Sequence, residues 1–462
     1  MPAATTSLET LVQSVSDVPA TERLAFAIDG IARECPDRAA LVVDAGGAAR
    51  RVIDYATLAG GIARLEQALA VARPVGVVAK SARPESLVAI AAACGRQRVP
   101  LAFVTADSSF LVTELHGWVT VDDALVLPAG IPARRDRDSV PPPVIVATSG
   151  TSGPPKLVDH AWDSVLAAAR LAGQWHGLGW LLVYDASRWA GIQVWAQALL
   201  TGGRLVVPAS RDPDVVARAI ADETVAILPA TPTLLRRLVS SADRSVLARA
   251  RVERITLGGE ATDADLLRQT QELFPGAKIT QVYATTELGE VFRVADGRTG
   301  FPAAWLGRAL PGGVRLSTRR DGELLVQLSR DTAEVATGDL VERRGDRCEF
   351  VGRRTDVIVV GGAKAYPKRI EELLRGVPGV VEARVRGLPS AITGELVAAE
   401  IVLADPLPAA ASPESIRAAA LAACRTSLDP HAVPRILDIV KRIATTAAGK
   451  TPRTAAQAAT RS

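Results

Sequence analysis

Short hydrophobic runs alternate with amphipathic segments through the first half of the chain. Residues 75–79 and 99–104 are apolar and flank the amphipathic stretch 85–95, which predicts a strand, a helix and a second strand. The same pattern recurs around residues 203–230. Alternation of this kind predicts a mostly parallel sheet whose two faces are covered by helices.

The second half of the chain follows a different pattern. Residues 322–328 and 346–352 are typical of antiparallel strands joined by polar turns. A helix beginning near Lys368 then precedes two further expected strands, at 380–388 and 396–403. We therefore expect two domains, a large one over residues 1–354 and a small α+β one over residues 355–462.

Composition narrows the class of protein. The 462 residues are 48% hydrophobic, so the chain can bury large cores, and 54 Lys and Arg against 50 Asp and Glu give a net charge of only +4. No basic run with interleaved aromatics appears, so nucleic acid is not an expected partner. The N-terminus lacks a signal-peptide pattern and no apolar run reaches the length of a membrane span. The four cysteines are scattered and lack the spacing of a metal site: Cys35, Cys94, Cys348 and Cys424. With no signal peptide or membrane span expected, we predict a cytoplasmic protein whose thiols are reduced.

An apolar run, "VIVA", leads directly into a loop rich in hydroxyls and glycines, "TSGTSGPPK". Hydroxyl donors, close backbone approach at glycines and one cation suit the oxygens of a polyphosphate. The spacing differs from the Walker pattern, and no Ser or Thr follows the lysine. The candidate phosphate-binding residues are Thr148, Ser149, Gly150, Thr151, Ser152, Gly153 and Lys156.

This loop resembles the phosphate-binding signature of the adenylate-forming superfamily, which includes acyl-CoA synthetases, adenylation domains of nonribosomal peptide synthetases and luciferases. Further stretches resemble later family motifs in the same order: "ITLGGEAT", "QVYATTELGEV", "ATGDL" with "GRRTD", and "TTAAGKTPR". The resemblance spans roughly residues 30–455. It implies an α/β and α+β fold: a large N-terminal domain of layered, mostly parallel sheets with helices and a small β-barrel-like subdomain, and a small mobile C-terminal domain.

The resemblance also implies roles for individual residues. Tyr283 would lie against adenine, with Gly259 and Glu260 bordering the adenine and acyl sites. Asp339 would accept the ribose hydroxyls, with Arg353 as a nearby donor. Thr286 would contact phosphate and Glu287 would hold Mg²⁺, a hard cation that takes carboxylate oxygen. Lys156 would bind the polyphosphate, and Lys450 would be the catalytic lysine.

The implied reaction has two halves. A carboxylate attacks the α-phosphate of ATP and releases pyrophosphate, and a thiol of CoA or of carrier-protein phosphopantetheine then attacks the acyl-adenylate. Residues 359–366, "VVGGAKAY", stand where the family forms its pantetheine tunnel. Departures from the family pattern include Ala284 for a glycine, and Thr355 at a hinge position that is usually Asp or Lys.

The stretch "VYDASRWAGIQ" resembles the acyl-pocket segment of amino-acid adenylation domains. By that match Asp185 would pair with a substrate amine, although an aspartate here equally well caps the following helix. The expected pocket suits a small aryl or amino-bearing acid. Its candidate lining residues are Asp185, Trp189, Gln193, Pro229, Thr231, Gly258, Gly259 and Ala284, whereas His160 and His176 are expected to be structural.

Four functions remain open at this stage. The first is an AMP-forming acid–thiol ligase that uses CoA, and the second is a free-standing adenylation enzyme that loads a carrier protein acting in trans. The third is a diazotase-type relative that activates nitrite. The fourth is a nucleotide-binding regulatory protein without catalysis, against which Lys156, Glu287 and Lys450 argue.

Overall fold

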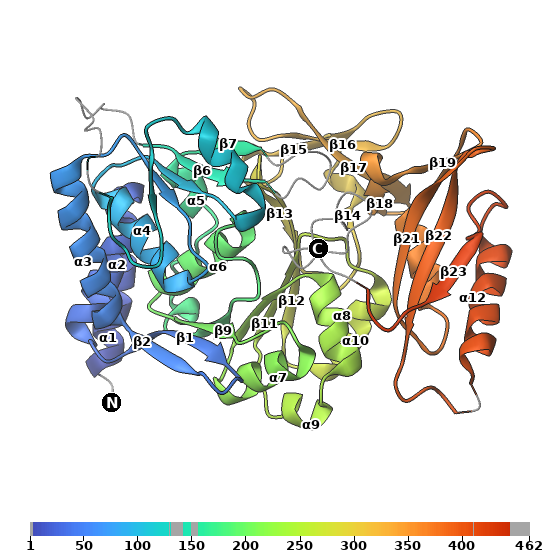
Figure 1. The fold of residues 1–462 in the computed structure, drawn as a ribbon, viewed down its shortest axis with the longest axis horizontal. Helices are drawn as coiled ribbons and strands as arrows, with labels where there is room; N and C mark the ends of the chain where they lie inside the picture. The colour runs from blue at the N-terminus through green and yellow to red at the C-terminus, as the bar shows by residue number, and fades with distance from the viewer. Residues whose placement is uncertain (1–2, 129, 131–141, 149–155, 410, 444–462) are drawn as a thin grey trace.

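The computed structural model describes residues 3–128, 130, 142–148, 156–409 and 411–443. The strands of this part of the chain form four sheets. Three sheets and most of the helices make a large N-terminal body, and one sheet with two helices makes a smaller C-terminal body beside it (Figure 1).

The largest sheet has eight strands in the order β13-β12-β11-β10-β8-β9-β1-β2. Its centre is parallel, and antiparallel pairs close both edges. The central strands are apolar because helices cover both faces, as the alternating pattern predicts. The strands are β1 (Ala39–Ala45), β2 (Arg51–Asp54), β8 (Gly179–Leu181), β9 (Arg204–Pro208), β10 (Ile227–Ala230), β11 (Arg254–Gly258), β12 (Lys278–Thr285) and β13 (Gly289–Val294).

A second, mostly parallel sheet has the order β5-β3-β4-β6-β7. The expected strand–helix–strand over residues 75–104 is confirmed as β3 (Val77–Ala79), α4 (Pro84–Arg96) and β4 (Leu101–Phe103). One apolar core joins residues of this sheet to residues of the eight-stranded sheet and to helices between them. The other elements of this layer are β5 (Val119–Val121), β6 (Val144–Ala147), β7 (Leu157–His160), α1 (Ala3–Ser14), α2 (Ala20–Glu34), α3 (Tyr55–Ala72), α5 (Trp162–Leu166) and α6 (Trp189–Leu200).

The opposite face of the eight-stranded sheet has its own core and helices. The pattern expected around residues 203–230 is confirmed there, since α7 connects the parallel strands β9 and β10 of this sheet. The helices are α7 (Pro213–Asp222), α8 (Pro232–Ser241), α9 (Arg244–Leu247) and α10 (Ala264–Leu273).

A five-stranded antiparallel sheet, in the order β14-β18-β17-β16-β15, completes the large body. The strands are β14 (Phe301–Pro302), β15 (Arg315–Thr318), β16 (Glu323–Gln327), β17 (Val335–Arg344) and β18 (Arg347–Arg353). The described residues also form 3₁₀ helices between the longer elements: η1 (Val15–Asp17), η2 (Ala106–Glu114), η3 (Gly173–Trp175), η4 (Ala303–Trp305), η5 (Pro311–Gly313) and η6 (Arg354–Asp356).

The C-terminal body begins in a new sheet after η6, with the order β20-β19-β22-β21 and β23 paired to β22. Gly361 and Gly362 form the two-residue turn of its first hairpin, and both have positive φ, which glycine adopts without strain. Two helices pack on this sheet over a separate core. The elements are β19 (Ile358–Val360), β20 (Ala363–Ala365), α11 (Pro367–Arg375), β21 (Val380–Ser390), β22 (Gly394–Leu403), α12 (Pro413–Ser427) and β23 (Ile436–Ile439).

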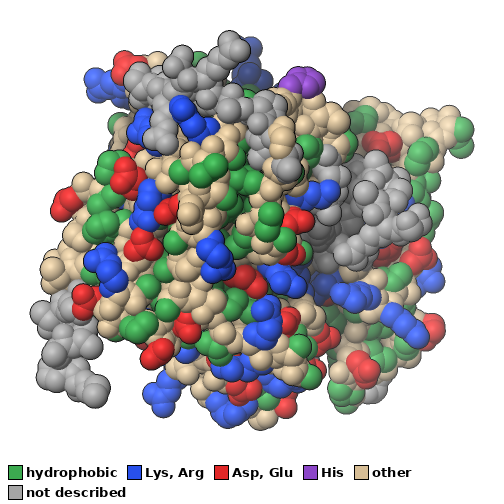
Figure 2. All heavy atoms as spheres, turned by 60° about the vertical axis from the view of Figure 1, so that its left-hand side comes forward, with side chains coloured by type: hydrophobic (Ala, Val, Ile, Leu, Met, Phe, Trp, Pro, Cys, Tyr) green, Lys and Arg blue, Asp and Glu red, His purple; other side chains and the backbone are tan. Residues whose placement is uncertain are grey.

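The surface agrees with the balanced composition. On the face that Figure 2 presents, basic and acidic side chains are intermixed. Among the described residues, every helix falls short of the length and apolarity that crossing a bilayer requires. Three of the four cysteines are buried, and each of the four is a free thiol.

Candidate active site

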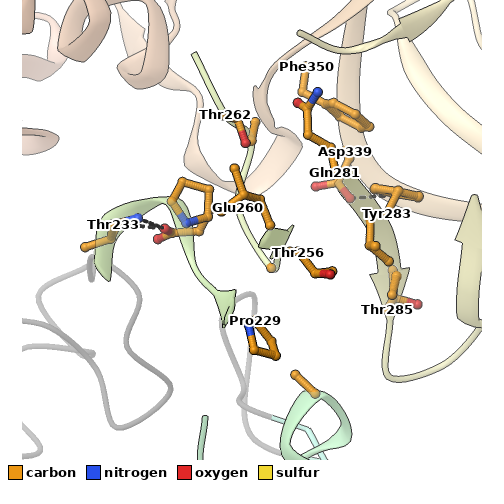
Figure 3. Close-up of a pocket in the computed structure, with 18 of the residues that line it drawn as sticks. Pro229, Thr233, Thr256, Glu260, Thr262, Gln281, Tyr283, Thr285, Asp339 and Phe350 are labelled. Carbon is orange, nitrogen blue, oxygen red and sulfur yellow. Dashed lines mark hydrogen bonds between the residues drawn. The ribbon is translucent and has the colours of Figure 1, made fainter. Parts of the chain in front are cut away.

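A cavity of about 900 Å³ lies where three neighbouring strands of the large sheet end. Residues at the carboxyl ends of β10, β11 and β12 line it, and open α/β sheets bind ligands at this edge of their strands. Figure 3 shows these residues, with Pro229, Thr256 and Gln281 on successive strands. The five-stranded sheet and the C-terminal body supply further walls, so the cavity lies between the two bodies.

The hydroxyl and glycine loop connects β6 to β7 at the cavity. The backbone N–H of Thr148 donates to the Lys156 carbonyl at 2.8 Å, and the Lys156 N–H donates to Thr148 Oγ1 at 2.9 Å. Both residues line the cavity, so the two ends of the loop are fixed beside it. The predicted residues between them, Ser149, Gly150, Thr151, Ser152 and Gly153, lie outside the described residues.

The Gly-Gly-Glu turn after β11 also lines the cavity. Gly259 has a φ of 84°, a backbone conformation that favours glycine, and Gly258 lies beside it. Glu260 accepts hydrogen bonds from Thr233 N at 3.1 Å and Thr233 Oγ1 at 2.6 Å (Figure 3). The turn is therefore held against the first turn of α8.

A hydrogen-bonded triad joins the eight-stranded sheet to the five-stranded antiparallel sheet at the cavity wall. Tyr283 Oη, from β12, donates to Asp339 Oδ2 at 2.7 Å (Figure 3). Asp339 lies in β17 directly opposite Arg353 of β18, whose Nε donates to Asp339 Oδ1 at 3.0 Å. The Tyr283 ring stacks with Phe292 and Phe350, each at 5.1 Å between centroids. Burial, and then the charge of Asp339, raise the pKa of Tyr283, so its hydroxyl stays a donor.

Thr286 and Glu287 occupy the tight turn between β12 and β13. The Leu288 N–H donates to Thr285 Oγ1 at 3.1 Å, which stabilises the turn. Glu287 is exposed and lines the cavity. The described residues contain no cluster of three or more side chains able to enclose a metal ion. Mg²⁺ does not need one, because it binds through one or two carboxylates together with substrate phosphates. Glu287 therefore fits a phosphate-bound Mg²⁺.

Asp185 and Trp189, two of the residues predicted for the acyl pocket, also line the cavity. Asp185 Oδ1 accepts hydrogen bonds from Ser187 N at 2.9 Å and Ser187 Oγ at 2.6 Å, while Oδ2 lies 3.8 Å from Arg188 Nε. The aspartate thus stabilises the turn before α6, although the N-cap position itself is Arg188. Gly191 packs so closely on this turn that a Cβ there would lie 2.0 Å from the Asp185 carbonyl oxygen.

One face of α6 lines the cavity. Trp189, Gln193 and Gln197 recur at helical spacing, so they lie in a row that spans about 12 Å along the axis. Gln193 Nε2 donates to the Val165 carbonyl at 2.7 Å. The Trp189 ring packs at 4.4 Å from the ring of buried His160, whose pKa is lowered by burial.

The structure adds lining residues that the sequence analysis missed. Trp175 and Trp180 pack at 5.7 Å between ring centroids and line the cavity together with Trp189. The buried indole N–H groups of these three tryptophans have no hydrogen-bond partner among the described residues. The segment "GQWHGLGW" is aromatic and precedes a strand, but its sequence carries no periodicity that would place it in the pocket.

Two further predicted site residues are absent from the described lining of the cavity. Thr231 was expected in the pocket, but it is not among the described lining residues; instead its side chain caps α8 by accepting from Leu234 N at 3.1 Å. Pro229 and Ala284 do line the cavity. Lys450 lies outside the described residues, which end at Ile443.

The C-terminal body presents one particular face to the cavity. Its lining residues come from α11 and from β21, whereas the Gly361-Gly362 hairpin contributes none among the described residues. The lining residues of this body are Lys368, Glu371, Glu372, Arg375, Glu382 and Ala383.

Known proteins resemble the chain in sequence. It matches the AMP-binding enzyme family over residues 47–326 and the AMP-binding enzyme C-terminal domain over residues 369–450. An acyl-coenzyme A synthetase of Mus musculus is 26% identical over 75% of this chain and 66% of its own length. A medium/long-chain fatty acid–acyl-carrier-protein ligase of Mycobacterium tuberculosis is 25% identical over 85% and 77%. Feruloyl-CoA synthase of Amycolatopsis sp is 29% identical over 66% and 67%.

Solved structures share the fold at lower identity. ATP-bound MatB from Rhodopseudomonas palustris has a TM-score of 0.69 at 19% identity, covering 97% of this chain and 98% of that one. The amide bond synthetase McbA from Marinactinospora thermotolerans has a TM-score of 0.69 at 23% identity, covering 95% and 99%. The expected fold class is therefore confirmed. Because the AMP-binding match alone spans more than half of the 462 residues, the chain belongs to the AMP-binding enzyme family, within the adenylate-forming superfamily of acid ligases.

Proposed function

We propose that the protein adenylates an aryl carboxylic acid with ATP, releases pyrophosphate, and transfers the acyl group to the thiol of CoA. One observation carries the proposal: a single cavity brings together Lys156, Glu287, Asp339 and a pocket lined with tryptophans. These groups are the ones that a polyphosphate, its Mg²⁺, a ribose and an aromatic acid require.

The nucleotide half of the cavity supports this assignment. Lys156 and the residues that precede it would bind the polyphosphate, since its oxygens need a cation and several donors. Mg²⁺ held by Glu287 would neutralise charge on the leaving pyrophosphate. Asp339 would accept the ribose hydroxyls while Tyr283 and Arg353 hold its orientation, and the rings of Tyr283, Phe292 and Phe350 provide an aromatic wall for adenine.

Lys450 completes the proposed machinery. Both reactants of the adenylation step are anions, so a cation between the carboxylate and the α-phosphate lowers the barrier. The carbonyl of Ile443 is hydrogen-bonded to Arg237, which is adjacent to the cavity-lining Arg236. The seven residues from Ile443 to Lys450 can span at most about 25 Å. Lys450 is therefore within chain reach of the cavity.

The end of the cavity lined by Trp175, Trp180 and Trp189 favours an aryl acid. Aromatic side chains pack well on an aromatic ring, and ligand pockets of this kind orient a ring through apolar walls. A long alkyl chain would make less use of three flat indole faces. Asp185 already accepts from Ser187 and faces Arg188, which favours an aryl acid over one that needs an amine partner. Feruloyl-CoA synthase, by its name, acts on such an acid.

A carrier protein is the second candidate acceptor. The relative from Mycobacterium tuberculosis is, by its name, an acyl-carrier-protein ligase, and it matches 85% of this chain. Both acceptors present the same pantetheine thiol, so the cavity described here serves either of them.

The test is ATP–pyrophosphate exchange across a panel of acids, with Lys450→Ala as the control variant. The panel should compare 4-hydroxybenzoate and ferulate with octanoate and with an amino acid. We expect exchange with the aryl acids, at least tenfold less with octanoate, and none in the variant. Exchange with amino acids alone would reassign Asp185 to an amine. If no carboxylic acid supports exchange but nitrite is activated, the diazotase-type reaction replaces the proposal. If neither carboxylic acids nor nitrite give activity, a non-catalytic role is favoured.

The acceptor is then decided with the acid that gives exchange. CoA and a phosphopantetheinylated carrier protein are offered separately, and thioester is measured by mass spectrometry. Thioester with CoA alone supports the proposal, and thioester with the carrier alone selects the second candidate.

A further inference from the structure

Arg237, on α8, joins three separate segments of the chain. Its Nε and Nη2 donate to the two carboxylate oxygens of Glu382 at 2.6 and 3.0 Å. Its Nη2 also donates to the carbonyl oxygen of Ile443 at 2.8 Å. Glu382 lies in β21 and Ile443 follows β23, so one guanidinium ties the large body to two parts of the C-terminal body.

The geometry of these contacts makes them strong. Side-chain exposure is only 12% for Arg237 and 17% for Glu382, so solvent screens the pair far less than it screens a surface ion pair. The bidentate arrangement fixes the orientation of both groups, because the planar guanidinium matches the carboxylate. The guanidinium also donates to the backbone carbonyl of Ile443, a residue that is only 1% exposed.

A second chain of charges crosses the interface beside Arg237. Asp263 of the large body pairs with Arg236 and lies 3.6 Å from Arg375 of α11, which in turn lies 3.9 Å from Glu371. Burial, and then the positive charge of Arg236, lower the pKa of Arg375. These residues line the cavity, whereas Arg237 is not among its described lining residues and instead holds the Ile443 carbonyl.

We propose that Arg237 is a positioning residue for the adenylation half-reaction. By holding Glu382 and the Ile443 carbonyl, it keeps the C-terminal body, to which the proposed catalytic Lys450 is attached, against α8. The inference rests on the proposed function, in which Lys450 acts in adenylation. Because Lys450 is proposed to act in adenylation, loss of the Arg237 contacts should slow the first half-reaction and spare the second.

The first test separates the two half-reactions. Arg237→Ala is compared with the wild-type protein in ATP–pyrophosphate exchange and in thioester formation from synthetic acyl-adenylate and CoA. The expected result is a 10- to 100-fold fall in kcat for exchange, KM values for ATP and acid within about threefold, and a thioester rate that is unchanged or higher. The charge-swapped pair Arg237→Glu with Glu382→Arg should recover part of the exchange rate that either single change loses.

The matched control is Arg249→Ala. Arg249 also pairs with a carboxylate, Asp222, but both side chains are largely exposed and lie away from the cavity. It should leave both half-reactions unchanged. Equal losses in both half-reactions for Arg237→Ala, or no loss in either, would overturn the proposal.

A second measurement is independent of any acid. Trypsin cleavage after Arg354, in η6 between the two bodies, reports how firmly the C-terminal body is held. Arg237→Ala should be cleaved there at least threefold faster than wild type, and Arg249→Ala at the wild-type rate. Unchanged cleavage would show that Arg237 does not hold the C-terminal body. If the wild-type protein gives no exchange with any acid, the proposed function fails. The cleavage rates still show whether Arg237 holds the C-terminal body against the large body.

Discussion

Tyr283 and Asp339 lie in two different sheets and share a 2.7 Å hydrogen bond at the cavity wall. The bond fixes a carboxylate whose other oxygen is held by Arg353, so Asp339 has little rotational freedom. A preoriented acceptor loses less entropy when it binds two hydroxyl groups. The junction between the two sheets would thereby form part of the proposed nucleotide site.

The first prediction concerns Tyr283→Phe. The change keeps the ring between Phe292 and Phe350 but removes the donor to Asp339. We expect KM for ATP to rise roughly three- to tenfold, because one such hydrogen bond contributes about 0.5–1.5 kcal/mol. KM for the acid should stay constant. Exchange kinetics, with ATP and the acid varied in turn, measure the two KM values. An equal rise for acid and ATP would show that the hydroxyl serves the fold rather than the nucleotide.

The second prediction concerns the proposed metal carboxylate. Glu287→Gln keeps the size of the side chain but removes its charge, so Mg²⁺ should bind more weakly. We expect pyrophosphate release to fall about 100-fold at 1 mM Mg²⁺, to recover partly at higher Mg²⁺, and to stop in wild type with EDTA. Glu290→Gln is the matched control, because Glu290 also lines the cavity but is paired with Arg293. A Mg²⁺ dependence that is the same in both variants would argue against a metal at Glu287.

The third prediction concerns the close contact of α6 with the Asp185 turn. Gly191→Ala places a methyl group 2.0 Å from the Asp185 carbonyl, so the turn or the helix must shift. We expect a loss of about 1–3 kcal/mol in the free energy of unfolding and a higher KM for the acid. Denaturant unfolding and exchange kinetics measure the two effects.

The control for this change is Gly60→Ala in α3. The nearest atom to a Cβ at Gly60 is a flexible arginine nitrogen at 3.7 Å. Alanine is the better helix former by about 0.5–1 kcal/mol, so this variant should be slightly more stable than wild type. Destabilisation of similar size in both variants would mean that the Asp185 contact is not the cause.

The fourth prediction concerns pH and Asp263. Burial alone would raise the pKa of Asp263, but Arg236 and Arg375 outweigh it and hold the pKa below its ordinary value of 3.8. The folded state therefore favours the charged form. Its stabilising contribution is present above about pH 4 and is lost as the pH falls through the lowered pKa.

Asp263→Asn isolates this charge. Asp263 also caps α10 by accepting from Leu266 N at 2.9 Å, and asparagine caps helices about equally well. The variant should lose about 2 kcal/mol of stability at pH 6, and the difference from wild type should shrink as the pH approaches 3. Urea unfolding at several pH values tests this, and a difference that is constant with pH would contradict the assignment.

The elements of the fold were largely predictable from local pattern. The strand–helix–strand at residues 75–104 and the helix near Lys368 follow from hydrophobic periodicity and turn residues, and both are confirmed. The strand that carries Asp339 was not predicted, because "VATGDLVERR" has no alternation of apolar and polar residues and is buried only in part.

The candidate site was predictable where a motif is contiguous. Tyr283, Thr286 and Glu287 occupy one short stretch, and the structure brings them to the same cavity as Lys156 and Asp339. Contacts between distant segments left no local signal. Arg237 and Glu382 are separated by 145 positions, and nothing in "LLRRLV" distinguishes the arginine that lines the cavity from the one that faces the other body.

The division of Arg237 and Glu382 between the two bodies has a consequence for protein engineering. Exchanging the C-terminal body for that of a relative would pair Arg237 with whatever residue the donor carries at the position of Glu382. A chimera that keeps both members of the pair should retain the native orientation of its grafted part. A chimera that keeps only one would bury an uncompensated charge at the junction, so the compatibility of such grafts is decided at this position as much as in the catalytic motifs.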